Sequence, residues 1–377
     1  MKIYFAPMEG ITGYPFRNAH HRFYSGIDRY YTPFLNLHHT LAFTEKEKRD
    51  IAPENNRGVP LVCQVLTNKA EEFLHAAGML AELGYDEIDL NLGCPSGTVV
   101  SKHRGAGFLS DPEALDRFFT DVFAALPGGM RVSVKTRTGI ADPLEADEIF
   151  PVFYRYPFSE LIVHPRVRND FYRNPPDLDV FEKILQNSPI PVCYNGDIKT
   201  VDDFRNIRER FPALQAVMIG RGLLENPGLA QEIRREIISG PSSRFPAAQP
   251  VLSPEDPCIT EGSAPPGEES GCLPENRKQP DRAEVPEIAA SLQDGSHSPE
   301  KLSEFHDALL KNYLEEIPEF NNVLFKMKDL WSYLGVSFPG NEKSLKKIRK
   351  ARNRSEYDTA VREILPPRNL SFLSSSL

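Results

Sequence analysis

Several features that mark whole classes of protein are missing from this chain. None of its apolar stretches is long enough to cross a bilayer, which argues for a soluble globular protein. No secretory signal precedes the strand-like sequence of residues 1–5, so we expect a cytoplasmic location. The five cysteines show neither an even disulfide framework nor a Cys-x-x-Cys pair for zinc. We therefore expect free thiols and no metal site.

An excess of positive charge is also missing, because 44 Lys and Arg stand against 53 Asp and Glu, a formal net charge of −9. The average hides a contrast along the chain. Residues 241–300 hold 4 basic against 11 acidic residues, whereas residues 301–377 hold 13 against 10, most densely at 343–354. The negative total therefore does not exclude a nucleic-acid partner for the carboxyl-terminal part.

Short apolar runs separated by helical segments fill the first 240 residues. A parallel strand buried on both faces reads as continuous Val, Ile and Leu, and seven such runs lie at 3–8, 61–66, 88–91, 132–135, 161–164, 191–195 and 217–220. A weaker run at 28–34 brings the number to eight. Eight strand–helix repeats in about 240 residues match a (β/α)8 TIM barrel, and we expect this α/β fold for residues 1–240.

Local signals place helices and boundaries around these strands. A capping box at the start of 68–81 predicts a helix there, Asp111 before Pro112 predicts an N-cap, and Thr200 with an acid three residues later predicts another capping box. Residues 241–300 contain 11 of the 33 prolines and almost no apolar period, which indicates a disordered acidic linker. Helix-period apolar positions then predict a small all-α domain at 301–377.

Polar or reactive residues stand where the predicted strands end, and in a parallel barrel these ends meet at one rim. The residues expected to share this rim are Met8, Gln64, Asn91, Lys135, His164, Asn195 and Gly220. Cys94 follows Gly93 and precedes Pro95, a break that turns the thiol into a loop where a catalyst would stand. Lys135 and Arg137 occupy alternate positions, so both can face the cavity and attract an anionic or electron-accepting group.

Glycines follow the last two predicted strands, at 195–197 (Asn-Gly-Asp) and 220–222 (Gly-Arg-Gly). Barrels of this type often bind phosphate in these two loops, and we expect a phosphorylated cofactor there. Taken singly, His164 or Lys135 has an ordinary structural explanation. Polar side chains at the same end of successive buried strands, however, are costly unless they bind something.

Together these residues resemble a known family. The matching segments are 6–10 (Ala-Pro-Met-Glu-Gly), 91–95 (Asn-Leu-Gly-Cys-Pro), 135–137 (Lys-Thr-Arg), 164–166 (His-Pro-Arg), 195–198 (Asn-Gly-Asp-Ile) and 220–222 (Gly-Arg-Gly). They closely resemble the tRNA-dihydrouridine synthases. The resemblance covers residues 1 to about 235 and, more loosely, the helical carboxyl-terminal part.

The resemblance implies an FMN-dependent enzyme that reduces the C5–C6 double bond of a uridine in tRNA and uses NADPH to recharge the flavin. Hydride would pass from flavin N5 to C6, and Cys94 would protonate C5 as general acid, for which a near-normal thiol pKa is suited. Asn91 and Arg137 would lie near the uracil. The residues that would hold FMN are Pro7, Met8, Gln64, Lys135, His164, Asn195, Gly196, Asp197, Gly220 and Arg221.

The implied partner is tRNA, whose backbone the basic helices would grip while a base is extruded. We expect a monomer without membrane association. No Gly-x-Gly-x-x-Gly motif, the signature of a dinucleotide-binding site, follows a strand. The expectation that NADPH is the reductant therefore rests on the resemblance alone. Pro165 stands where the family usually has glycine, and we expect it to rigidify the loop after the sixth strand.

Three other functions fit parts of the pattern. An FMN barrel acting on a small molecule would leave the basic helices without a role. A phosphate-binding isomerase or aldolase that uses Lys135 to form a Schiff base would be colourless, because it needs no flavin. A catalytically silent RNA-binding protein would bind tRNA without any dependence on Cys94.

Overall fold

The computed structural model describes residues 1–37, 41–239 and 298–365. The described residues up to Arg234 and those from Ser298 onward belong to one compact unit. Nearly all of the predicted linker, together with Cys258 and Cys272, lies outside the described residues.

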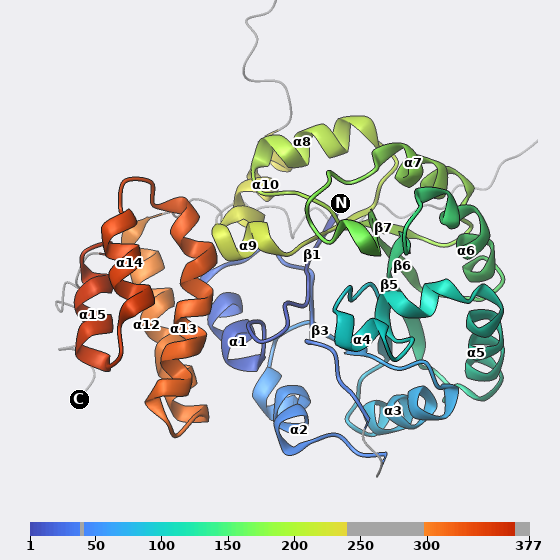
Figure 1. Ribbon diagram of the computed structural model, residues 1–377, viewed down its shortest axis with the longest axis horizontal. Helices are drawn as coiled ribbons and strands as arrows, with labels where there is room; N and C mark the ends of the chain where they lie inside the picture. The colour runs from blue at the N-terminus through green and yellow to red at the C-terminus, as the bar shows by residue number, and fades with distance from the viewer. Residues whose placement is uncertain (38–40, 240–297, 366–377) are drawn as a thin grey trace, which may run out of the picture. The chain divides into compact units, whose positions relative to one another are not determined.

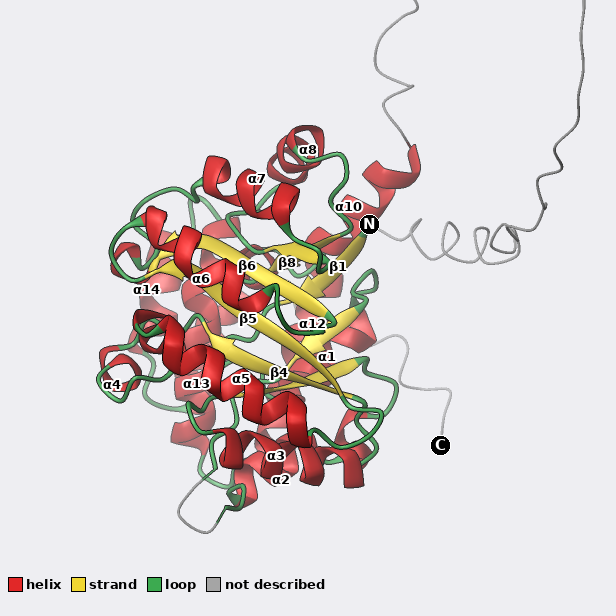
Figure 2. Ribbon diagram, turned by 90° about the vertical axis from the view of Figure 1, so that its right-hand side faces the viewer, coloured by secondary structure: helices red, strands yellow, loops and turns green. Residues whose placement is uncertain are grey.

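Eight parallel strands close into a barrel inside a ring of helices (Figure 2), with each strand hydrogen-bonded to the next and β1 paired with β8. The strands are β1 Lys2–Phe5, β2 Arg29–Tyr31, β3 Leu61–Val65, β4 Glu87–Leu92, β5 Arg131–Gly139, β6 Glu160–Val167, β7 Val192–Tyr194 and β8 Ala216–Ile219. The predicted TIM barrel is confirmed, including its weak second strand.

Helices follow the strands of the barrel along the chain, and α9 and α10 come after the last strand. They are α1 Tyr14–Phe23, α2 Glu45–Ile51, α3 Ala70–Glu82, α4 Gly97–Val100, α5 Pro112–Ala125, α6 Ala146–Phe153, α7 Leu178–Asn187, α8 Val201–Arg210, α9 Arg221–Glu225 and α10 Leu229–Ser239. Two predicted caps are confirmed. Asp111 Oδ1 accepts a hydrogen bond from the Ala114 N–H (2.9 Å), and Thr200 and Asp203 form a reciprocal capping box.

The predicted capping box before α3 is wrong. The N-cap of α3 is Lys69, without a side-chain hydrogen bond, and Asn68 Nδ2 donates instead to the carbonyl of Lys102. Thr67 makes the side-chain hydrogen bonds at the start of α3 instead. Its hydroxyl accepts from the Lys69 N–H (3.1 Å) and donates to the Glu72 carboxylate (2.6 Å).

Strand β4 shows why the apolar runs were continuous. Ile88, Leu90 and Leu92 are fully buried, while the alternate residues Asp89 and Asn91 are buried as well. The interior is filled by one buried cluster of Tyr4, Ala6, Tyr31, Val62, Ile162, Cys193, Ala216 and Met218. The barrel is therefore a packed core rather than a pore, and a ligand must lie on its rim.

The carboxyl-terminal residues form the predicted all-α part, made of α12 Pro299–Glu316, α13 Phe320–Leu334, α14 Glu342–Lys350 and α15 Arg354–Arg362. Helix α12 begins two residues inside the range expected to be linker. Figure 1 shows these helices beside the barrel near α1 and α9. None of the helices in the described ranges is long and apolar enough to cross a membrane.

Helix α12 packs directly on α1. The ring of Phe305 meets those of Phe16 and Tyr24 edge-on, at centroid distances of 5.9 and 5.4 Å. Polar contacts surround these rings: Tyr313 Oη donates to the carbonyl of Ile11 (3.1 Å) and Asn312 Nδ2 to that of Pro15 (2.9 Å). The helical part is thus docked on the barrel through a mixed apolar and hydrogen-bonded contact.

Candidate active site

The ends of the strands bring the expected polar residues together. Asn91 Nδ2 donates to Gln64 Oε1 across β3 and β4 (2.7 Å), and Asn195 Nδ2 donates to the carbonyl of Met218 (2.8 Å). Pro7 and Met8 are half-buried after β1, and a Cβ atom added to Gly220 would lie 3.3 Å from Met8 Sδ. These residues line one rim of the barrel.

Cys94 stands on a tight turn after β4. The Oδ1 atom of Asn91 accepts the backbone N–H groups of Gly93 (3.0 Å) and Cys94 (2.9 Å), which closes the turn. From the other side Gly105, with φ +55°, packs so closely that an added Cβ atom would lie 3.0 Å from the Cβ of Cys94. The half-buried thiol is free and held between these two supports.

The surroundings of Cys94 keep its proton in place. Burial raises the pKa of the Cys94 thiol, and the nearby Glu9 carboxylate raises it further, whereas Arg137 and Lys135 act in the opposite direction. The net shift is upward, so the thiol is protonated at neutral pH. Such a group can act as a proton donor but is a poor nucleophile.

Lys135 is a half-buried cation at the same rim. Burial and then the charge of Arg137 lower its pKa, the Asp89 carboxylate opposes both, and the net value is about 8. Among the described residues no cluster of His, Cys, Asp and Glu could hold a metal ion. Lys135 and the neighbouring Arg137, Arg166 and Arg221 bring positive charge to this rim.

Arg137 connects two loops of the rim. Its guanidinium is buried and donates to three backbone carbonyls, those of Gly93 (2.9 Å), Val167 (3.0 Å) and Phe171 (3.0 Å). Arg137 therefore braces the Cys94 turn against the loop after β6. A direct contact of Arg137 or Asn91 with a uracil stays a prediction.

A second brace joins β6, β7 and β8. Arg166 donates to both carboxylate oxygens of Asp197 (3.0 and 2.5 Å), and Arg221 donates to Asp197 Oδ1 (2.5 Å). Although burial raises the pKa of Asp197, its hydrogen bonds and ion pair with Arg166 and the charge of Arg221 lower it overall. Arg166 was not among the predicted cofactor-binding residues, yet it ties β6 to the loop after β7. In the sequence, only its place in the 164–166 motif pointed to it.

His164 is neutral in this environment. Burial, and then the cations Arg137, Lys135, Arg166 and Arg221, hold its pKa well below the usual range. Its Nε2 atom lies 3.0 Å from Arg166 Nη1. Because a guanidinium only donates, Nε2 must accept, which leaves the ring proton on Nδ1.

Pro165 lies inside a strand and not in a loop, contrary to our expectation, because β6 continues to Val167. The pairing of β6 with β7 ends at Val163, and its pairing with β5 shifts register between Arg137 and Gly139. Pro165 therefore sits where no ladder hydrogen bond needs its missing N–H.

Gly196 and Gly222, in the last two loops, are required by packing inside the protein. A Cβ atom on Gly196 would lie 2.1 Å from Tyr194 Oη, and one on Gly222 would lie 2.1 Å from the carbonyl oxygen of Ile198. These contacts explain the glycines without a ligand. A phosphate at these loops stays a prediction.

Two further residues at the rim carry no motif in the sequence. Tyr172 is 49% exposed, and its ring lies against Arg221 (4.5 Å from guanidinium carbon to ring centroid), Arg137 (5.5 Å) and the ring of His164 (5.9 Å). Lys326 of α13 reaches the barrel and donates to the carbonyl of Gly10 (2.8 Å). Both positions depend on tertiary packing, which the sequence pattern does not record.

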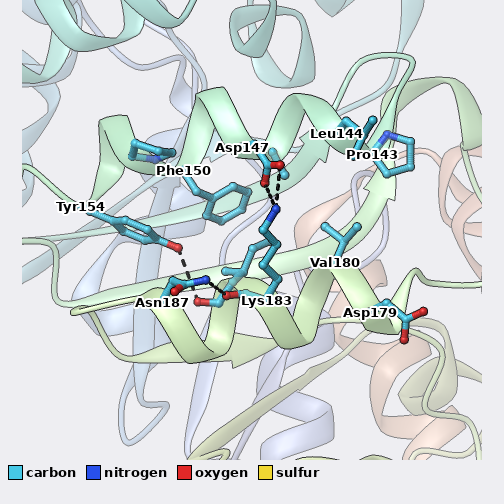
Figure 3. A pocket seen from close by; sticks show the side chains of 12 residues that line it. Pro143, Leu144, Asp147, Phe150, Tyr154, Asp179, Val180, Lys183 and Asn187 are labelled. Carbon is cyan, nitrogen blue, oxygen red and sulfur yellow. Dashed lines mark hydrogen bonds and ion pairs between the residues drawn. The ribbon is translucent and has the colours of Figure 1, made fainter.

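The two larger of the cavities described lie away from the rim. One of about 770 Å³ runs between α14 and α15 and is lined by Lys343, Lys346, Lys347 and Lys350. The other, of about 450 Å³, lies between α6 and α7, where Lys183 and Asp147 form an ion pair beside Phe150 (Figure 3). None of the rim residues lines either cavity.

Comparison with known proteins places the chain in a family. Residues 4–252 match the family model described as dihydrouridine synthase (Dus). The chain is 33% identical to a tRNA-dihydrouridine(16) synthase of Cupriavidus necator over 250 residues, covering 64% of this chain and 76% of that protein. It is also 33% identical to the Pseudomonas putida protein of the same name, with 62% and 73% covered.

Among solved structures, morphinone reductase superposes with a TM-score of 0.45 at 14% identity, covering 62% of this chain and 85% of that one, which is too weak a likeness to carry an argument. The family model, in contrast, spans well over half of the sequence and includes every residue of the rim that precedes the helical part. This chain belongs to the dihydrouridine synthase family.

Proposed function

We propose that this protein reduces a uridine of tRNA to 5,6-dihydrouridine, with hydride passing from FMN to C6 and a proton from Cys94 to C5, and with NADPH as the reductant. The observation that carries the proposal is a free thiol fixed on a turn beside the half-buried Lys135 and the buried Arg137, and burial raises the pKa of this thiol. Relatives named tRNA-dihydrouridine(16) synthase support the choice of tRNA as substrate.

The side chains of the rim fit FMN. When bound, FMN supplies the hydride. Lys135 provides a half-buried positive charge, which favours a ring system that gains negative charge on reduction. Gly220 presents no side chain toward Met8, and Arg221 carries a cation next to the last loop. The residues that would hold the cofactor are Pro7, Met8, Gln64, Lys135, His164, Asn195, Gly196, Asp197, Gly220 and Arg221.

The arrangement of Asp197 agrees with this assignment. A free carboxylate would repel a phosphate, but Asp197 is bonded to both Arg166 and Arg221. The pair of arginines therefore leaves this corner of the rim with a net positive charge. A cationic corner beside glycine-rich turns is suited to a phosphate group.

The residues around Cys94 prepare it as an acid. The turn closed by Asn91 fixes the direction of the thiol, and Arg137 ties that turn to the loop after β6. A positioned general acid contributes roughly 10²- to 10⁴-fold to rate. The exposed ring of Tyr172 offers a surface on which an extruded base can stack.

The helical part supplies the charge for an RNA backbone. Helix α14 carries lysines 343, 346, 347 and 350, which face the cavity between α14 and α15. Lys326 brings a further cation to the barrel rim. We propose that these helices hold tRNA electrostatically while one base enters the barrel mouth, and that the reaction takes place in the cytoplasm on a monomeric enzyme.

The proposal is tested with tRNA from cells that lack this protein. Purified protein should be yellow and, with NADPH, should convert one uridine position to dihydrouridine, as mapped by mass spectrometry of tRNA fragments. Position 16 is the first place to examine, because the relatives above are named for it. A colourless protein that takes up no flavin, or an unchanged uridine map, would contradict the proposal.

A further inference from the structure

A buried carboxylate below the rim has no part in the reaction described above. Asp89 of β4 is fully buried in the barrel interior. Its Oδ2 atom accepts from Gln64 Nε2 (2.7 Å), and its Oδ1 atom accepts from Ser133 Oγ (2.8 Å). The strand register explains both contacts, because Asp89 pairs with Gln64 on β3 and with Ser133 on β5.

From Asp89 a continuous chain of hydrogen bonds runs to the turn that carries Cys94. Gln64 donates to Asp89 and accepts from Asn91 Nδ2 (2.7 Å). Asn91 in turn accepts the N–H groups of Gly93 (3.0 Å) and Cys94 (2.9 Å) through Oδ1. Each link is buried or partly buried, so water cannot readily substitute for a missing partner.

The direction of this chain is fixed at both ends, because the backbone N–H groups of the turn only donate and the carboxylate of Asp89 only accepts. The amide groups of Gln64 and Asn91 have nearly the same shape when their oxygen and nitrogen are exchanged, so shape alone does not orient them. An ionised carboxylate can only accept, which forces Nε2 of Gln64 toward Asp89 and Oε1 toward Asn91. Asn91 must then donate to Gln64, and its oxygen is left for the two backbone N–H groups of the turn.

The charge on Asp89 is set by opposing effects. Burial raises its pKa, the hydrogen bonds from Gln64 and Ser133 and the charge of Lys135 lower it, and the net value is about 7. The ionised form predominates at pH 8. At that pH the chain has a single allowed direction.

We propose that Asp89 is a positioning residue for Cys94: as a fixed acceptor it orients the side chains of Gln64 and Asn91 and thereby holds the turn that presents the thiol. The consequence for catalysis rests on the proposed function, in which Cys94 is the acid. The consequence for the turn itself does not depend on that reaction.

Two substitutions of Asp89 separate its role as acceptor from its charge. Asp89→Asn keeps an oxygen for Gln64, and its new amide can donate to Ser133 Oγ. The direction of the chain survives, because the N–H groups of Gly93 and Cys94 can only donate and still require the oxygen of Asn91. Asp89→Leu removes the acceptor as well as the charge. Any effect seen with leucine but absent with asparagine therefore belongs to the hydrogen-bond chain.

The first readout is hydrogen exchange at the backbone amides of Gly93 and Cys94, measured on the full chain at pH 8. We expect Asp89→Leu to speed exchange about tenfold, the effect of one hydrogen bond, while Asp89→Asn stays near wild type. Amides of α8 serve as an internal control for general loosening. If Asp89→Leu does not fold, Gln64→Met cuts the same chain one link higher and should give the same result.

The second readout is reoxidation of the reduced enzyme by unmodified tRNA in a single turnover. Asp89→Leu should slow this step, and it should add nothing when Cys94 is already alanine, because both changes then remove the same proton delivery. Unchanged exchange at Gly93 and Cys94 in both Asp89→Leu and Gln64→Met, or equal loosening by Asp89→Asn, would overturn the proposal. Failure of the wild type to reduce tRNA would instead reject the proposed function and leave the exchange result standing.

Discussion

Burial acts in opposite directions on the two titratable side chains that matter most at the rim. It raises the pKa of the Cys94 thiol, which keeps the proton that an acid must give, and it lowers the pKa of Lys135 to about 8, which makes that charge sensitive to pH. Both shifts arise from desolvation, which disfavours the charged form of either group. The same desolvation thus keeps the Cys94 thiol protonated and makes the charge of Lys135 sensitive to pH.

Replacing Cys94 by alanine should separate proton delivery from cofactor binding. The thiol is half-buried on a turn whose support comes from Asn91, and its removal leaves the cations of the rim in place. We expect Cys94→Ala to retain its flavin and to lose roughly 10²- to 10⁴-fold in the rate of tRNA reduction. Stopped-flow absorbance of the flavin together with dihydrouridine analysis measures both quantities, and undiminished product would reject the acid role.

Cofactor affinity should fall as the solution becomes more alkaline. The folded-state pKa of Lys135, about 8, lies below its ordinary value of 10.5, so the charge is present at pH 7 and is lost as pH rises through about 8. FMN carries an anionic phosphate and gains further negative charge on reduction, so we expect weaker binding at pH 9 than at pH 7. Fluorescence titration of flavin-free protein with FMN measures this affinity, and the Lys135→Gln variant should lack the pH dependence. If the affinity of the wild type did not change between pH 7 and pH 9, the assignment would be contradicted.

The sequence pattern located single residues well where a short motif places them at the end of a strand. Cys94, Lys135 and Asn91 lie at the rim as expected. Tyr172 and the brace between Arg166 and Asp197 were not predicted, because their contacts join loops whose approach depends on barrel closure. Short sequence motifs predict which residues lie at the ends of strands, but they do not predict which of these side chains contact one another across the rim.

Strands and helices were predicted where one physical cause dominates. The strands read as apolar runs because both of their faces are buried, and α5 and α8 begin at caps whose partners lie three residues away. The cap of α3 was wrong because Thr67 and Glu72 satisfy that end of the helix in place of Asn68. Pro165 was misplaced because a register shift, which composition does not reveal, admits it into β6.

Two glycines on helices should respond in opposite ways to an added methyl group. In α9 a Cβ atom on Gly222 would meet the carbonyl oxygen of Ile198 at 2.1 Å, and this backbone atom cannot move without shifting the loop after β7. We expect Gly222→Ala to destabilise the protein by about 1–3 kcal/mol. Urea denaturation measures this change in the free energy of unfolding.

Gly78 in α3 provides the matched control, because nothing lies within 4 Å of an added Cβ atom there. Alanine has the higher helix propensity, so Gly78→Ala should be neutral or stabilising by up to about 1 kcal/mol. Equal effects of the two substitutions would show that crowding at Gly222 is not what requires glycine.

The sequence predicted that the carboxyl-terminal part is all-α, but it did not predict that this part docks on the barrel. Almost 300 residues separate Phe305 from Phe16 along the chain, yet their rings are in contact. The same packing brings α13 close enough for Lys326 to bond the loop after β1. The rim of the barrel and the helices that we propose to hold tRNA are therefore parts of one compact unit.

Loss of the Phe305 ring should weaken this unit. The side chain is fully buried among Phe16, Phe23, His20 and Tyr24. We expect Phe305→Ala to lower the free energy of unfolding by about 3–5 kcal/mol and to weaken tRNA binding, while the folded fraction keeps its flavin.

Phe325, which is 74% exposed on α13, is the control for removal of an aromatic ring from the same helical part. Phe325→Ala should change stability by no more than about 0.5 kcal/mol. Thermal unfolding followed by circular dichroism compares the two variants. A Phe305→Ala protein as stable as Phe325→Ala would show that the α1–α12 contact contributes little.

The most direct measurement of the reaction itself is a single turnover between the reduced enzyme and unmodified tRNA. The account predicts that the yellow absorbance of the flavin returns as tRNA is added, with one dihydrouridine formed for each flavin reoxidised, and that Cys94→Ala shows neither change at the wild-type rate. A protein without flavin, or one whose reduced flavin ignores tRNA and instead reduces a small unsaturated compound, would contradict it.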